Sequence, residues 1–211
     1  MSTPDAGGTV RRPRRGTRPR VVQAWIELLA EDPEALSAES VARARTAAGA
    51  GLVSLRRLRL IELRGPLPAR REIEGLLHRS IQFYNPHKER CHVRATARDP
   101  VPVRPGEVAV LVWDRDGERR PAAERWWDHQ TGARIEVREG SVWLMTFAPD
   151  GDPGGRARGL AVTDGRDSGL LCNPNAQEYR LAADRVPVEW FATTAESRTP
   201  AAIPAAQGAT R

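Results

Sequence analysis

The segment EVAVLVWD at residues 107–114 constrains the fold more than any other part of this sequence. It is short and nearly all apolar, which is typical of a strand buried on both faces at the centre of a sheet. The chain has 211 residues, 40% of them apolar, which is enough for one domain with a real core. Six tryptophans add large apolar areas, so we expect this core to need no covalent staples.

Hydrophobic periodicity predicts the elements around this strand. Apolar residues at helical spacing, bounded by proline, glycine or a capping serine, predict helices at 21–31, 38–49, 73–84 and 121–129. Short apolar runs predict strands at 57–64, 91–96 and 186–192. Hairpins are predicted around Gly140 (133–148) and around 164–167 (159–172), with a glycine-rich flexible loop between them at 149–156.

This order of elements predicts an α+β fold, in which a mainly antiparallel sheet carries helices on one face. A ferredoxin-like arrangement is one form that such an order can take. The helical N-terminal part, residues 21–50, would be an addition to it. We expect residues 21–193 to form a single domain, flanked by disordered tails at 1–20 and 194–211.

The basic charge of the chain belongs to its N-terminal tail. The formal net charge is +6, and residues 1–20 hold six Arg and one Asp, a net of +5, so the other 191 residues carry only +1 (6 − 5). The tail is expected to be a solubilising terminus, with contact to nucleic acid or an acidic partner as the alternative. The near-neutral domain does not predict a broad nucleic-acid surface.

Several patterns are typical of a soluble, cytoplasmic protein. No apolar run approaches the ~20 residues that span a bilayer, and the charged start has no apolar segment behind it. We therefore expect no membrane partner, and reduced thiols at Cys91 and Cys172 rather than a disulfide.

Residues of rare types gather in two short segments. The basic residues are 32 Arg and one Lys, a bias that GC-rich bacterial genomes produce because Lys, Asn and Tyr use AT-rich codons. A position that keeps one of these types is expected to need its chemistry. Every Lys, Asn, Tyr and Cys of the chain lies in 83–92 (FYNPHKERCH) or 172–179 (CNPNAQEY), which hold 18 of the 211 residues.

Both segments contain an Asn-Pro pair near a Cys, and we infer that they meet in space as one polar site. Asn-Pro fixes a turn, Lys and Arg can hold a phosphate or carboxylate, and Asn amides can bind a planar polar ligand. A purely structural use of these residues, to hold loops together, is the alternative. The predicted ligand-binding residues are Tyr84, Asn85, His87, Lys88, Glu89, Arg90, Cys172, Asn173, Asn175 and Tyr179.

Three chemistries compete on these residues. Cys91 is a candidate nucleophile, because a cation such as Lys88 lowers the pKa of a nearby thiol. His87 and Glu89 could act as acid and base, and Lys88 could form a Schiff base. Zinc is a further cofactor candidate, although the spacing of its ligands matches no established zinc pattern. Its four ligands would be His87, Cys91, His92 and Cys172.

The sequence favours a non-enzymatic binding or accessory protein, whose ligand is an anionic or planar polar small molecule, or a protein partner. A small enzyme using Cys91, His87 or Lys88 is the second hypothesis. A nucleic-acid-associated protein acting through the Arg-rich tail is the third. The adjacent Trp126 and Trp127 are expected to anchor a short helix, with one ring buried and the other partly exposed.

Overall fold

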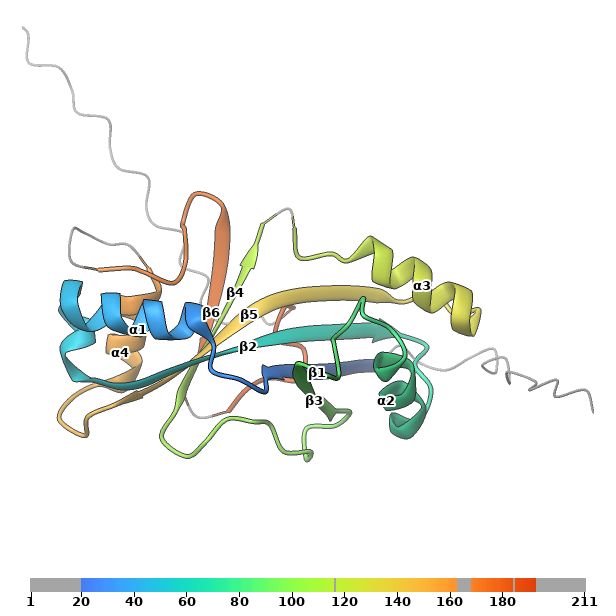
Figure 1. Cartoon of the computed structure of the whole chain (residues 1–211), viewed down its shortest axis with the longest axis horizontal. Helices are drawn as coiled ribbons and strands as arrows, with labels where there is room; N and C mark the ends of the chain where they lie inside the picture. Colours follow the sequence, from blue (N-terminus) through green and yellow to red (C-terminus); the bar gives the residue numbers. More distant parts are fainter. Residues whose placement is uncertain (1–19, 116, 163–167, 184, 193–211) are drawn as a thin grey trace, which may run out of the picture.

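The computed structural model describes residues 20–115, 117–162, 168–183 and 185–192. The predicted tails, except for Arg20, and the predicted turn at 164–167 therefore lie outside the described residues. Figure 1 shows the elements in chain order. They are β1 (Arg20–Leu28), α1 (Pro33–Arg45), the 3-10 turn η1 (Ala48–Gly51), β2 (Leu52–Gly65), α2 (Arg70–His78), β3 (Glu89–Arg94), β4 (Val108–Asp114), α3 (Pro121–Thr131), β5 (Glu136–Phe147), α4 (Pro153–Ala161) and β6 (Gln177–Ala182).

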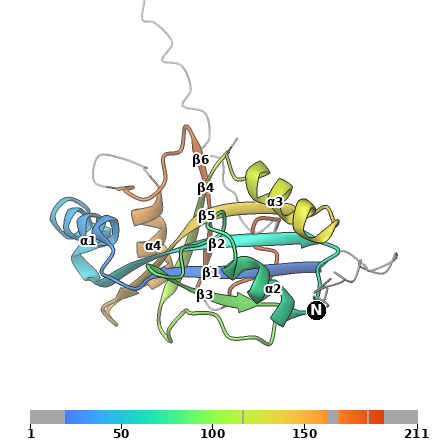
Figure 2. The same cartoon turned by 45° about the vertical axis from the view of Figure 1, so that its right-hand side comes forward.

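The six strands form one sheet in the order β3-β1-β2-β5-β4-β6. Figure 2 shows them stacked in this order, with β6 and β3 at the two edges. Every pairing between neighbouring strands is antiparallel. The α+β prediction is confirmed. The ferredoxin-like arrangement stays a prediction. Its sheet is also antiparallel, because each of its split βαβ units leaves one strand between the two strands it joins. The units β2-α2-β3 around β1 and β5-α4-β6 around β4 have this form.

All four helices lie on the same face of the sheet, in two pairs. Helices α2 and α3 pack over Ile61 and Leu63 of β2, whereas α1 and α4 pack over Leu55 of the same strand. Side chains of odd-numbered residues in a regular strand share a face, so both pairs cover one side. Figure 1 shows the pairs at opposite ends of the long strands β2 and β5.

Among the described residues, no helix covers the opposite face. Leu58 and Leu60 of β2 pack there with Trp25, Trp190 and Phe191, and the rings of Trp25 and Trp190 lie 6.2 Å apart. The strand predicted at 186–192 is wrong, because these residues form bends and turns. Their backbone groups instead form hydrogen bonds with side chains of the sheet, namely those of Gln23, Glu62 and Arg94.

The predicted helix at 21–31 is wrong, because Arg20–Leu28 forms strand β1. Residues 22 to 26 are all buried, since this inner strand is covered on both faces. A strand buried on both faces shows no alternation of apolar and polar residues. Its nearly continuous run of apolar residues can therefore be mistaken for the apolar face of a helix. The helix that follows begins at Pro33 and not near residue 38, because the Asp32 side chain accepts hydrogen bonds from the amides of Glu34 and Ala35.

Three further predictions about the second half of the chain are wrong. The hairpin around Gly140 is one continuous strand, β5. Helix α4, which begins at Pro153 and is capped by Asp152, replaces both the loop at 149–156 and the first strand of the hairpin at 159–172. Strand β6 was not predicted. No helix in the described part of the chain is both long and apolar enough to span a membrane.

Candidate ligand-binding cleft

The two segments rich in rare residues lie at opposite edges of the sheet. The 83–92 segment leads into β3, and the 172–179 segment leads into β6. Four strands, β1, β2, β5 and β4, separate these edges. We therefore correct the inference that the segments meet as one site. The rare residue types that the two segments share indicate that both need the same local structure. They do not indicate that the segments touch.

This local structure is a turn closed by hydrogen bonds within the segment, and one such turn lies at each edge of the sheet. In the 83–92 segment the Asn85 side-chain oxygen accepts from His87 N at 3.0 Å, its carbonyl accepts from Glu89 N at 2.8 Å, and its own amide donates to Glu89 Oε2 at 2.6 Å. Asn85 thus begins the turn and Glu89 closes it, at the first residue of β3.

The 172–179 segment repeats these contacts with Asn173 and Gln177. The Asn173 side-chain oxygen accepts from Asn175 N at 3.0 Å, its carbonyl accepts from Gln177 N at 2.7 Å, and its amide donates to Gln177 Oε1 at 2.9 Å. The pattern Asn-Pro-x-x-Glu/Gln therefore starts both edge strands, which is the structural explanation of the shared Asn-Pro pair.

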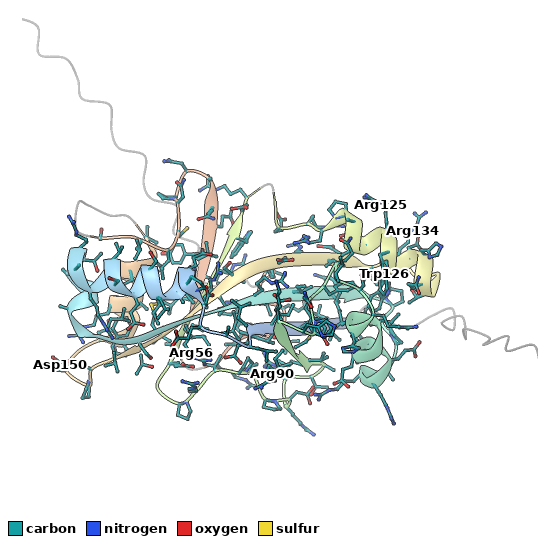
Figure 3. The ribbon with its side chains drawn as sticks, in the orientation of Figure 1. Arg56, Arg90, Arg125, Trp126, Arg134 and Asp150 are labelled. Atoms are coloured by element: carbon teal, nitrogen blue, oxygen red, sulfur yellow. The ribbon has the colours of Figure 1, made fainter. Side chains whose placement is uncertain are left out.

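The remaining predicted site residues are divided between the core and the open surface. Tyr84 is buried, and its hydroxyl lies 2.9 Å from His78 Nδ1. Tyr179 is half-buried on β6. The exposed side chains are those of His87, Lys88, Arg90, Asn173 and Asn175, and Figure 3 shows Arg90 by the edge strand β3.

The two cysteines lie at separate places. Cys172 is buried, whereas Cys91 is half-buried and lines a pocket together with Tyr84 and His92. Cys91 packs with the cluster under α2 and α3, and Cys172 belongs to the cluster under α1 and α4. Burial raises the pKa of Cys91 to about 12 and that of Cys172 to about 11. This direction is opposite to the activation of a nucleophile. The predicted zinc ligands do not converge either, because Cys91 and Cys172 lie in different clusters.

A strip of polar side chains interrupts the helix-bearing face between the two helix pairs. On β2, this face carries Leu55, Arg57, Arg59, Ile61 and Leu63, so two arginines stand in the middle of an apolar row. These arginines are only half-buried, whereas the three apolar residues are buried. The polar strip marks the part of the sheet that no helix covers.

Strand β5 continues the strip, because Glu139 and Ser141 lie on the same face between Val137 and Trp143. The pairing of β5 with β2 places Ser141 opposite Arg59. We call Arg57, Arg59, Glu139 and Ser141 the central polar strip.

Ion pairs hold one half of this strip in place. Glu139 Oε1 lies 3.0 Å from Arg59 Nη1, and Glu139 Oε2 lies 2.5 Å from Arg120 Nη1. Arg59 Nη2 also donates to Glu89 Oε1 at 3.1 Å and to the Phe83 carbonyl at 2.8 Å. The closing residue of the β3 turn is thereby joined through the strip to the start of α3.

The other half of the strip is anchored to α1. Arg57 donates to Asp32 Oδ2 at 2.8 Å and also pairs with Glu34. Its guanidinium carbon lies 5.8 Å from the ring centre of Trp143. Partial burial would raise the pKa of Asp32, but the hydrogen bonds and charge of Arg57 outweigh it and lower that pKa. The neighbouring Arg56 is also paired, with Glu27 and Glu107.

A cleft of about 260 Å³ opens beside this strip. Its apolar lining residues include Val112, Trp143 and Leu171, and Ser141 also lines it. The described charged residues of the lining are Glu34, Asp114, Glu139 and Arg120. Arg57 pairs with Glu34, and Arg59 and Arg120 pair with Glu139. Asp114 takes part in no ion pair between described residues and accepts only a neutral donor from Gln177. This carboxylate favours a ligand that donates hydrogen bonds or carries positive charge.

The 172–179 segment contributes to this cleft through Gln177. This side chain lines the cleft, and its Nε2 donates to Asp114 Oδ1 at 2.9 Å. Gln177 belongs to the predicted range 172–179, although it was not named as a site residue. Asp114 was not predicted. The sequence does carry a signal for this region. On one face of β2, the apolar positions are interrupted by Arg57 and Arg59, beside the cleft.

The Trp126-Trp127 pair behaves as the sequence predicts. Trp127 is buried, Trp126 is half-buried, and both rings pack edge-on against Phe83 at 6.2 and 5.6 Å. Figure 3 shows Trp126 below α3. The pair anchors this helix to the loop that follows α2.

Comparisons of the chain with protein-family models, with curated proteins and with solved structures found no significant match. Function is therefore inferred from the chemistry of the cleft.

Proposed function

We propose that the protein is a small-molecule binding or accessory protein, and that the cleft beside the central polar strip holds a planar ligand bearing a positive charge or amide donors. One observation carries this proposal: three carboxylates and the apolar side chains of Val112, Trp143 and Leu171 line one cleft at the place where the two helix pairs leave the sheet open. Fixed polar groups of this kind orient a ligand in its pocket.

The charges around the cleft are already held in place. Glu139 is fixed by two arginines, and Asp114 by Gln177. A ligand would therefore meet acceptors that need little rearrangement, which reduces the entropy lost on binding. The size of the cleft suits a ligand with one ring rather than a dinucleotide.

Binding is favoured over catalysis by the residue types of the lining. The described lining residues include no histidine, cysteine or lysine, and these are the usual proton-transfer and nucleophilic groups at neutral pH. The enzyme hypothesis on Cys91 is also opposed by the raised pKa of that thiol. Ligand binding by the other predicted residues, and nucleic-acid binding by the N-terminal tail, stay predictions.

A pair of probes of opposite charge tests the proposal. Benzamidine is a planar ring with a cationic donor group, and benzoate has nearly the same shape with the charge reversed. Isothermal titration is expected to give saturable benzamidine binding with a Kd of about 1 mM, as suits so small a ligand. Benzoate is expected to give none.

Matched variants of the cleft complete the test. Ser141→Tyr fills the cleft and is expected to weaken benzamidine binding at least about tenfold, whereas Ser141→Ala leaves the cleft open and is expected to change it little. Circular dichroism establishes that both variants are folded. Equal binding of benzoate, or benzamidine binding unchanged by Ser141→Tyr, would contradict the proposal.

A further inference from the structure

A second pocket, of about 360 Å³, lies apart from the cleft, between the loop that joins β3 to β4 and the chain after β6. Its lining includes Arg94 at the end of β3 and Ala182 at the end of β6, so the last residues of both edge strands contribute to it. In Figure 1, the β3–β4 loop runs along the lower side of the sheet. The described lining shares no residue with that of the cleft.

Arg94 is a buried cation whose described partners are neutral. Its residue is only 3% exposed, and its Nη1 donates to Gln23 Oε1 at 3.1 Å and to the carbonyls of Val186 and Pro187 at 3.0 and 3.3 Å. Its Nε is buried without a hydrogen-bond partner. The carboxylates of Asp99 and Glu62 attract this charge from a distance, but no described carboxylate bonds to it directly. An anion beside the buried guanidinium would therefore be stabilising.

Two more arginines line the same pocket. Arg104 and Arg185 are exposed, and neither takes part in an ion pair between described residues. Arg185 Nη2 donates to the Ala97 carbonyl at 3.3 Å, which holds it across the loop. Burial lowers the pKa of Arg94, and the charge of Arg185 lowers it further, so the two cations are close enough to repel each other.

The two carboxylates in the lining are engaged elsewhere. Glu107 binds Arg56 with both oxygens, at 2.9 and 3.0 Å, and accepts the backbone amide of Arg104 at 2.6 Å. Asp99 accepts the amides of Ala95 and Thr96 at 2.8 and 2.9 Å. Three arginines therefore face a pocket in which the acidic groups are already satisfied.

We propose that this pocket binds a phosphate group through Arg94, Arg104 and Arg185. Guanidinium groups match the oxygens of a phosphate with paired hydrogen bonds. The pocket exceeds the roughly 30 Å³ of one water by about an order of magnitude, so a phosphomonoester fits as well as free phosphate. This proposal does not depend on the function of the cleft.

Titrations with inorganic phosphate and with phenyl phosphate test it, at constant ionic strength set with potassium chloride. Saturable binding is expected, and Arg104→Gln combined with Arg185→Gln is expected to weaken it at least about tenfold. Both positions are exposed, so folding should be preserved, whereas Arg94→Gln risks the fold. Arg98→Gln is the matched control, because this exposed arginine belongs to the same loop and is not among the described lining residues.

The outcomes separate the sources of the phosphate. Tighter binding of phenyl phosphate supports a phosphomonoester ligand, and equal binding supports free phosphate. The proposal is overturned if neither probe binds saturably, or if the double variant binds as well as Arg98→Gln.

Discussion

Glu62 is a buried carboxyl at the centre of a polar network under the chain segment 186–191. It is 5% exposed, and its Oε1 accepts from Gln23 Nε2 at 3.0 Å and from Trp190 N at 2.6 Å. Gln23 Oε1 in turn accepts from Arg94. Burial raises the pKa of Glu62 to about 7, against an ordinary value of 4.5, because the hydrogen bonds offset only part of its desolvation.

The raised pKa makes the stability of the fold depend on pH. The native state keeps a proton on Glu62 that the unfolded state releases above pH 4.5, so the free energy of unfolding falls as pH rises from 4.5 to about 7. The loss is about 3 kcal/mol. Urea unfolding of the wild type at several pH values is expected to show it.

The variant Glu62→Gln isolates this contribution. The amide oxygen can still accept from Gln23 and Trp190, but the side chain no longer titrates. Its unfolding free energy should therefore be flatter between about pH 5 and about pH 7 than that of the wild type. Parallel pH profiles for the two proteins would show that Glu62 does not carry the dependence.

At the scale of elements, the paired Asn turns explain why rare residues gather where they do. Asn85→Ala removes the side-chain acceptor that holds His87 N, and it is expected to lower the unfolding free energy by about 1 kcal/mol. Asn85→Asp keeps an acceptor and should cost less. Benzamidine binding should be unaffected by either change. If Asn85→Ala abolished benzamidine binding without changing stability, the turn would be part of the ligand site, contrary to this account.

Gly140 lies inside the continuous strand β5, where packing rather than a turn requires glycine. A β-carbon at this position would lie 2.8 Å from the Val112 carbonyl oxygen, so close packing against β4 excludes a side chain. Gly140→Ala is expected to destabilise the protein by about 2 kcal/mol in urea unfolding.

Gly75→Ala is the matched control for this substitution. A β-carbon at Gly75, on the exposed side of α2, would have open space around it, so helix propensity should make this variant more stable by about 0.5–1 kcal/mol. A Gly140→Ala protein as stable as the wild type would show that the strands can separate to admit a side chain.

At the scale of the whole molecule, the sequence predicted the fold class but not the layout of the sheet. The apolar run of β4 and the periodicity of α2 and α3 were sufficient for those elements. Strand β1 was mistaken for a helix because it is buried on both faces, and the order of strands depends on distant pairings that local patterns do not report.

The site was mislocated for a related reason. Residue rarity pointed to the turns that begin β3 and β6. The cleft instead arises from Glu139 and Ser141 of β5 and from Val112 and Asp114 of β4, which become neighbours only when β4 pairs with β5. Had residues 52–65 been interpreted as one long strand, the arginines at 57 and 59 would have stood out on an otherwise apolar face.

The central claim is that ligands enter the cleft and not the edge turns. The most direct measurement is an amide ¹H–¹⁵N NMR titration of the full chain with benzamidine. We predict saturable shifts at Gly117, Ser141 and Gln177, which line the cleft, and none at His87 or Lys88. Shifts confined to His87 and Lys88, or no saturable shift at the cleft residues, would contradict the account.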